Sequence, residues 1–366
     1  MTYHARLHSL QQTIQKNGCD AFLLEDPVNL FYMTGLELST GRLLVHSKGA
    51  DVLVDGRYFE SCKKKSPFPV TLADPPAFEA ILSSPEFGHI QKLGFDSETT
   101  TYKSYESLQK IVSRCTMEGH PLELMPLDAP LKLQRSIKDA GEIQALQEAA
   151  ALGSRGFDFV SELLEEGITE KECALELEIF WKRLGSKGVA FDPIIAFGAN
   201  SSMPHHRAGN DKLKVGQIVL IDIGVNFKHY HSDMTRIVFY GKPDTRLLAV
   251  HAIVQKAQQA ALSLCKPGTL IGQLDKTARD IIAEHGYAEN FTHSLGHGVG
   301  LDIHEYPTLR NALPLAETPL KAGMVITIEP GIYLPQIGGV RIEDTVAITE
   351  EGHENLTLRN SDPIFV

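Results

Sequence analysis

The sequence lacks the features of secreted and membrane-spanning proteins. Its five cysteines are dispersed and form no Cys-x-x-Cys pair, which fits reduced structural thiols better than a disulfide framework. The first residues, MTYHARLHSLQQTIQKNG, contain no apolar signal-peptide core. No stretch approaches the roughly 18 apolar residues of a membrane span. We therefore expect a cytoplasmic protein that does not contact a membrane.

Basic clusters are also missing. Acidic residues outnumber lysine and arginine by 46 to 35, for a net charge of −11. This sign repels phosphate backbones, and no basic block is interleaved with aromatic residues, so nucleic acid is excluded as a partner. The 366 residues are 43% hydrophobic, enough to fill the cores of two domains at about 100–200 residues each.

The order of apolar patterns predicts two domains of different class. Residues 1–127 alternate short strands with helices, which indicates a mixed α/β domain. Prolines then interrupt the pattern, and we place a linker over residues 128–136. In residues 137–366, two helical blocks are each followed by hairpin strands. This repetition is compatible with an internally duplicated α+β domain.

Four carboxylates stand inside otherwise apolar strands of the second domain. Asp222 and Asp233 lie on two runs joined by a turn near residues 226–229, and a turn centred between residues 227 and 228 would place them directly opposite each other. Opposed like charges destabilise a sheet. Glu329 and Glu343 repeat the arrangement.

Bound cations would compensate for these acids. Two divalent ions about 3.5–4 Å apart, bridged by carboxylates, are the simplest solution, and strand alternation places Arg341 on the same face as Glu343. A single acid in a strand is more often solvent-facing. The carboxylates alone therefore leave both interpretations open.

Clustered histidines favour the metal site. The segment HSLGHGVGLDIHE carries His293, His297 and His304, and GANSSMPHHRAG carries His205 and His206 on a turn. Imidazole beside carboxylates suits manganese, cobalt, zinc or iron, whereas magnesium and calcium sites are built from oxygen. Any single one of the 15 histidines is more often structural, so the clustering carries the argument.

Five segments in register resemble the proline-specific peptidases of the pita-bread metallopeptidase family, of the aminopeptidase P and prolidase type. They are GANSSMPHH, DIGVNFKHYHSDMTR, HSLGHGVGLDIHE, TIEPGIY and GGVRIEDT. The resemblance covers residues 135–366 closely, and DPVNLFYMTGL more loosely resembles a creatinase-type amino-terminal domain. It implies hydrolysis of the peptide bond preceding proline by a hydroxide that two metal ions activate. Manganese is the expected metal, with cobalt, zinc or iron as alternatives, and the expected partners are peptides with proline at the second position and a second copy of the chain in a homodimer.

The resemblance also implies a role for each candidate residue. Five are metal ligands, of which Asp233 and Glu343 bridge the ions: Asp222, Asp233, His297, Glu329 and Glu343. Glu329 is also the base, His205 lies near the substrate, and His304 stabilises the tetrahedral intermediate. Tyr230, His293 and Arg341 support the substrate pocket, and His206 is a neighbour without a catalytic role.

Three other functions are weighed against this one. Methionine aminopeptidases share the ligand pattern but usually lack the amino-terminal domain, and metal-free creatinase-like hydrolases depart at the ligand positions. A binding scaffold on the same fold would typically have lost ligands. The choice between dipeptidase and aminopeptidase stays open, although Thr308 stands where some archaeal-type prolidases place an arginine, which slightly favours longer substrates.

Overall fold

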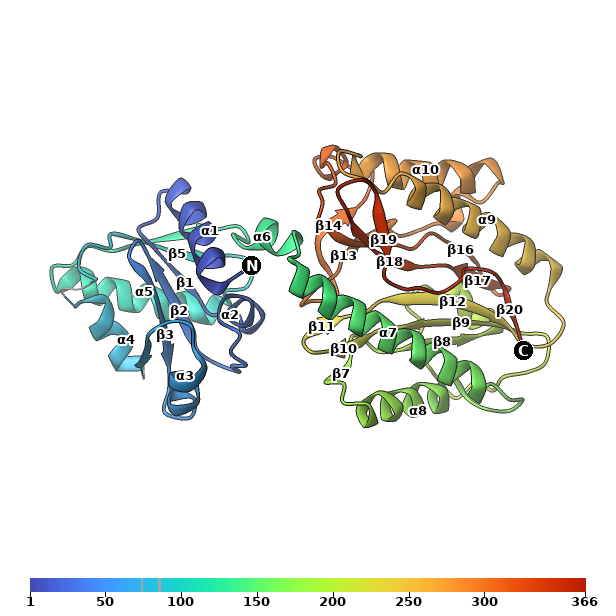
Figure 1. The fold of residues 1–366 in the computed structure, drawn as a ribbon, viewed down its shortest axis with the longest axis horizontal. Helices are drawn as coiled ribbons and strands as arrows, with labels where there is room; N and C mark the ends of the chain where they lie inside the picture. Colours follow the sequence, from blue (N-terminus) through green and yellow to red (C-terminus); the bar gives the residue numbers. More distant parts are fainter. Residues whose placement is uncertain (74, 85–86) are drawn as a thin grey trace. The chain divides into compact units, whose positions relative to one another are not determined.

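The computed structural model describes residues 1–73, 75–84 and 87–366. These residues form two compact units, Met1–Gln134 and Arg135–Val366, whose elements are labelled in Figure 1. The segment 128–136, expected to be a linker, contains the short helix α6 (Lys132–Ser136). No helix in the described ranges is long and apolar enough to cross a bilayer.

The first unit is built on a six-stranded mixed sheet. Its strand order is β4-β3-β2-β1-β5-β6, where β1 pairs antiparallel with β2 and parallel with β5. The strands are β1 (Ala21–Leu24), β2 (Arg42–His46), β3 (Gly49–Val54), β4 (Val70–Leu72), β5 (Lys92–Asp96) and β6 (Glu123–Leu127). The helices are α1 (Tyr3–Lys16), α2 (Pro27–Thr34), α3 (Phe59–Lys65), α4 (Pro75–Leu82) and α5 (Tyr102–Met117). The predicted mixed α/β class is confirmed.

The second unit consists of two successive helix-and-sheet halves (Figure 1). The first contains α7 (Ala140–Leu163), α8 (Glu170–Arg183), β7 (Gly188–Val189), β8 (Ile194–Phe197), η1 (Gly198–Ser202), β9 (Ile218–Ile223), β10 (Val225–Phe227), β11 (Tyr230–His231) and β12 (Met234–Phe239). The second contains α9 (Thr245–Ser263), α10 (Ile271–Glu284), η2 (Ala288–Asn290), β13 (Gly296–Gly298), β14 (Glu305–Leu309), η3 (Leu315–Glu317), β15 (Val325–Ile328), β16 (Gly331–Leu334), β17 (Gly338–Arg341), β18 (Asp344–Ile348), β19 (His353–Asn355) and β20 (Ile364–Phe365). The sheet orders are β20-β12-β9-β8, β14-β13-β15-β18-β19, β11-β10-β7 and β16-β17. Each half begins with two helices that are followed by paired strands. This repetition confirms the predicted α+β domain with internal duplication.

Strand β9 is apolar on both faces because helices cover both sides of its sheet. Val219 and Ile221 pack in a cluster with residues of α7 and α8. Ile218 and Leu220, which point the other way, pack in a second cluster with residues of α9 and α10. Asp222 follows Leu220 by two residues, so its side chain lies on the same face of the strand as Ile218 and Leu220. A carboxylate at the end of this buried face requires compensation.

The pairing of β9 with β12 differs from the prediction. Asp222 lies opposite Thr235, not Asp233, so Asp233 is a diagonal neighbour on the same face. The hairpin turns at Lys228 and His229, which both have positive φ, 51° and 74°. A two-residue turn of this kind matches the twist of the strands. Lysine seldom adopts positive φ, whereas histidine is enriched there, and the turn lies one residue later than the sequence pattern indicated.

Candidate metal centre

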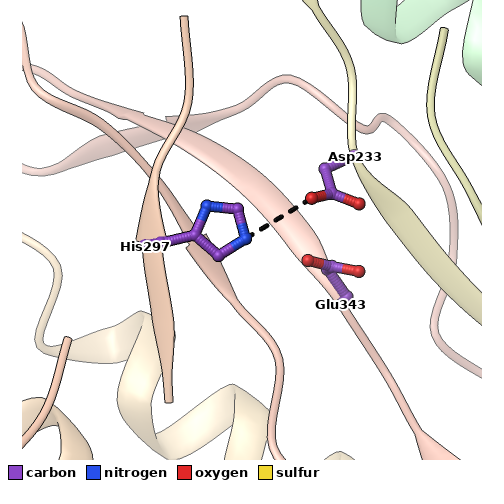
Figure 2. Close-up of side chains that lie close together, drawn as sticks. All are labelled: Asp233, His297 and Glu343. Atoms are coloured by element: carbon purple, nitrogen blue, oxygen red, sulfur yellow. Dashed lines mark ion pairs between the residues drawn. The ribbon is translucent and has the colours of Figure 1, made fainter. Parts of the chain in front are cut away.

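Three side chains, one within a strand and two just before strands, meet in the second unit. Asp233 precedes β12, His297 lies in β13 and Glu343 precedes β18. Each offers one ligand atom, and these atoms lie within 4.8 Å of one another. Figure 2 shows the three side chains pointing toward one another, with His297 Nε2 3.5 Å from Asp233 Oδ2. This is a compact nitrogen-and-oxygen donor set.

Glu329 joins the same cluster. Its Oε1 lies 3.5 Å from His297 Nε2. The pairing of β15 with β18 and the pairing of β16 with β17 follow the same register. Continued across the gap between the two pairs, this register places Glu329 directly opposite Glu343. The second hairpin therefore opposes its two acids, whereas the first places its acids diagonally.

Hydrogen bonding leaves one nitrogen of His297 available for coordination. His297 Nδ1 lies 3.0 Å from Gly298 O, and because a carbonyl can only accept, Nδ1 carries the proton. Nε2 then presents its lone pair to the carboxylates. A backbone acceptor that fixes the tautomer in this way is typical of metal-binding histidines.

Asp222 supplies an unsatisfied acceptor beside the cluster. Its Oδ2 contacts Arg341 Nη2. Its Oδ1 is buried and has no hydrogen-bond partner within the described ranges. Buried polar atoms are seldom left unpaired, and a cation would satisfy this one.

The electrostatics of the cluster call for positive charge. Burial raises the pKa values of Asp233 and Glu343 well above their ordinary range, and repulsion between neighbouring carboxylates adds to the rise. Burial likewise raises the pKa of Glu329 to about 8, against the lowering effect of Arg341. Without cations the Glu329 carboxyl retains its proton at neutral pH. The donor set therefore fits divalent metal ions, which favour the ionised form.

The neighbouring histidines are neutral at physiological pH. Burial, followed by the charge of His304, lowers the pKa of His297 to about 4. Burial and Arg341 lower the pKa of His293 to about 3. The His304 ring lies 4.3 Å from that of His297, centroid to centroid, and burial lowers the His304 pKa as well. Neutral imidazoles can coordinate a metal or donate a hydrogen bond without adding charge.

A hydrogen-bonded chain links Arg341 to His293 through Tyr333. Arg341 Nη1 donates to Tyr333 Oη at 2.6 Å, and that oxygen lies 2.8 Å from His293 Nε2. Because His293 Nδ1 faces Ser294 O at 2.8 Å, Nδ1 carries the proton and Nε2 accepts from the tyrosine hydroxyl. Burial raises the pKa of Tyr333 to about 12, so it retains its proton.

The sequence interpretation missed Tyr333 and Thr235. Thr235 Oγ1 donates to Glu343 Oε2 at 2.7 Å and accepts from Arg341 Nε at 3.1 Å. The hairpin register could have indicated Tyr333, which is diagonal to Arg341 on one face of the β16–β17 pair. Thr235 could not be found without the correct pairing of β9 and β12.

Of three other residues named from the sequence, two hydrogen-bond to glutamates outside this network. Tyr230 Oη donates to Glu142 Oε1 at 3.0 Å, in the first turn of α7. His205 is exposed on the segment after η1, and its charge lowers the pKa values of His293 and His304. His206 Nε2 lies 2.8 Å from Glu170 Oε2.

Comparison with known proteins gives matches over both units. The model of metallopeptidase family M24 matches residues 144–350, and that of the creatinase/prolidase N-terminal domain matches residues 6–137. The Xaa-Pro dipeptidase of Pyrococcus furiosus is 37% identical over 353 residues, which are 96% of this chain and 97% of that protein. The structure of an Xaa-Pro dipeptidase from Bacillus anthracis has a TM-score of 0.93 and 34% identity, with 100% of both chains covered. The X-Pro aminopeptidase from Thermotoga maritima has a TM-score of 0.87 and 32% identity, over 97% of this chain and 100% of that one.

Proposed function

Because this chain belongs to metallopeptidase family M24, we propose that it is a metallopeptidase that hydrolyses the peptide bond preceding proline. One observation carries the chemistry: a buried group of mutually repelling carboxylates lies around a neutral histidine. Divalent cations would balance the charge of these carboxylates. Relatives that align over almost the whole chain are named Xaa-Pro dipeptidases, which supports specificity for the bond preceding proline.

The cofactor we propose is a pair of divalent ions, with manganese preferred over cobalt, zinc or iron. Their ligands would be Asp222, Asp233, His297, Glu329 and Glu343. Asp233, His297 and Glu343 would hold metal together, since their ligand atoms lie within 4.8 Å of one another. Bound metal supplies hydroxide at neutral pH and polarises the scissile carbonyl.

Residues of the chain handle the protons and the developing charge. Glu329 takes the proton of the nucleophile and delivers it to the proline nitrogen, a secondary amine that needs a proton to leave. His304, neutral because burial lowers its pKa, donates a hydrogen bond to the carbonyl oxygen as negative charge develops there, and His205 assists. Arg341 orients Asp222 and Tyr333 through its contacts with both.

For the substrate we propose Xaa-Pro dipeptides, with longer peptides as the competing outcome. Relatives named dipeptidases favour this choice, whereas Thr308 at the position of the archaeal-type arginine favours longer substrates. We also propose that the chain forms a homodimer, as the family resemblance implies.

The decisive experiment measures metal content and hydrolysis together. The purified chain, loaded with manganese or cobalt, is assayed against Ala-Pro, Ala-Pro-Ala and Ala-Ala. We expect two ions per chain and cleavage of the two proline-containing peptides only, with Ala-Pro cleaved faster. A folded chain that binds no metal and gains no activity when given any would refute the proposal, and faster cleavage of Ala-Pro-Ala would reverse the order of substrates.

A matched pair of variants tests the base. Glu329→Gln should retain less than about a tenth of the parent activity, because general acid–base catalysis contributes about 10²–10⁴-fold. Glu284→Gln, at the end of α10 on the exposed surface, should behave as the parent. Retention of more than a tenth of the activity in Glu329→Gln would contradict the role of this residue.

A further inference from the structure

His206 lies next to the proposed active-site residue His205, yet its ring pairs with a buried carboxylate. His206 Nε2 lies 2.8 Å from Glu170 Oε2. An ionised carboxylate can only accept, so Nε2 carries the proton and donates. His206 is therefore engaged at a side chain that is not part of the metal centre.

Glu170 collects four donors from one segment of the chain. It lies in the first turn of α8 and is fully buried. Phe197 N and Asn200 Nδ2 donate to its Oε1 at 2.8 Å and 2.9 Å. Gly209 N donates to its Oε2 at 2.9 Å, beside His206. These four hydrogen bonds offset the cost of burying a carboxylate. They also attach both ends and the middle of segment 197–209 to the Glu170 side chain.

The same segment is also attached on its other side to β17, next to the metal centre. Gly339 N donates to Ser201 Oγ at 2.8 Å, and Arg341 Nη1 donates to Pro204 O at 3.5 Å. His205 thus stands between Pro204, which contacts the site arginine, and His206, which contacts Glu170. The His205 side chain is exposed and close enough to His293 and His304 to lower their pKa values.

We propose that Glu170 and His206 are positioning residues that hold His205 in place at the metal centre during Xaa-Pro cleavage. This inference rests on the proposed function. An exposed side chain on an irregular segment has many accessible conformations, and fixing it costs conformational entropy. The buried Glu170 contacts fix the chain on both sides of His205 before the substrate binds, which reduces the cost that remains.

A double-mutant cycle tests the coupling. His206→Leu removes the donor, whereas His206→Gln keeps an N–H at a similar distance. In the parent, His206→Leu should lower kcat/KM about 10-fold, because a hydrogen bond to a charged group is lost, and His206→Gln should stay within about twofold. In a His205→Ala background, His206→Leu should change kcat/KM by less than about twofold, since the two residues act as a unit.

Two controls separate positioning from general damage. The metal content of His206→Leu should equal that of the parent, because the ring does not contact the carboxylate cluster. His285→Leu, on the exposed surface after α10, should leave kcat/KM unchanged. If His206→Leu does not fold, the same cycle is run with Glu170→Gln, which keeps the shape of the side chain.

The opposite results would overturn the inference. If His206→Leu lowers kcat/KM by the same factor with and without His205, the two residues act independently. If His206→Gln is as impaired as His206→Leu, the hydrogen bond is irrelevant. Failure of the proposed function looks different: the parent itself would then lack metal-dependent cleavage of Ala-Pro.

Discussion

Removal of the metal should make the second unit less stable as the pH rises above about 6.5. In the metal-free folded protein, burial holds the pKa of Glu329 at about 8, against an ordinary value of 4.5. Between these values the folded form keeps a proton that the unfolded chain releases, so stability falls with increasing pH. Asp233 and Glu343, whose pKa values are also raised, contribute in the same direction.

The histidines contribute with the opposite sign at lower pH. His293 and His297 have pKa values of about 3 and about 4 in the folded protein, against 6.5 ordinarily. Their contribution is lost as the pH falls below 6.5. The carboxylates therefore dominate the pH dependence of stability only above about pH 6.5, and the measurement is made in that range.

The expected magnitude follows from the shift of Glu329 alone. One pKa unit corresponds to about 1.4 kcal/mol, so the free energy of unfolding should fall by about 2 kcal/mol between about pH 6.5 and pH 8. For a unit of this size, about 2–4 °C of melting temperature corresponds to each kcal/mol. The metal-free melting temperature should therefore fall by roughly 4–8 °C.

The single tryptophan makes the assay specific for the second unit. Trp181 is fully buried against α7, where its Nε1 donates to Leu152 O at 3.1 Å. Its fluorescence is followed during urea and thermal unfolding, with chelator or with saturating manganese. Glu329→Gln, which cannot titrate, should show a smaller pH dependence in chelator. A chelated parent that is equally stable or more stable at the higher pH would refute the electrostatic account of the cluster.

Three further predictions follow from single contacts. Gly296→Ala should reduce metal binding and lower the melting temperature, because the added Cβ would lie 2.1 Å from the backbone oxygen of Thr327. The control Gly352→Ala, where a Cβ would meet open space, should leave both measurements unchanged. Tyr230→Phe should cost about 1–2 kcal/mol of stability by removing one of the hydrogen bonds that Glu142 accepts, and it should change kcat by less than about twofold. A large rise in KM would instead place Tyr230 in the substrate pocket. Arg341→Lys should lower kcat/KM at least about 10-fold while metal remains bound. A single ammonium group cannot reproduce the contacts of the guanidinium with Thr235, Tyr333 and Asp222. Parent-like kinetics would contradict this role of Arg341.

Local patterns in the sequence indicated the two fold classes and marked the acids of the main cluster as unusual, while the clustered histidines and the family segments favoured a metal site. Alternation along a strand depends only on neighbouring residues, so carboxylates inside apolar runs stand out without knowledge of the fold. Asp233, Glu329, Glu343 and His297 do come together. The family segments added the order in which these acids and histidines follow one another.

The tertiary structure alone decided how the cluster is supported. Thr235 contacts Glu343, Tyr333 joins Arg341 to His293, and Glu170 holds His206. Apart from Tyr333 and Arg341, which share the β16–β17 hairpin, these partners are far apart in the chain, and no short-range periodicity relates them. The offset of Asp222 from Asp233 depended on a turn at Lys228 and His229, which the sequence pattern placed one residue earlier. A side chain's type and direction along its strand are local properties, whereas its partner is set by the packing of distant segments.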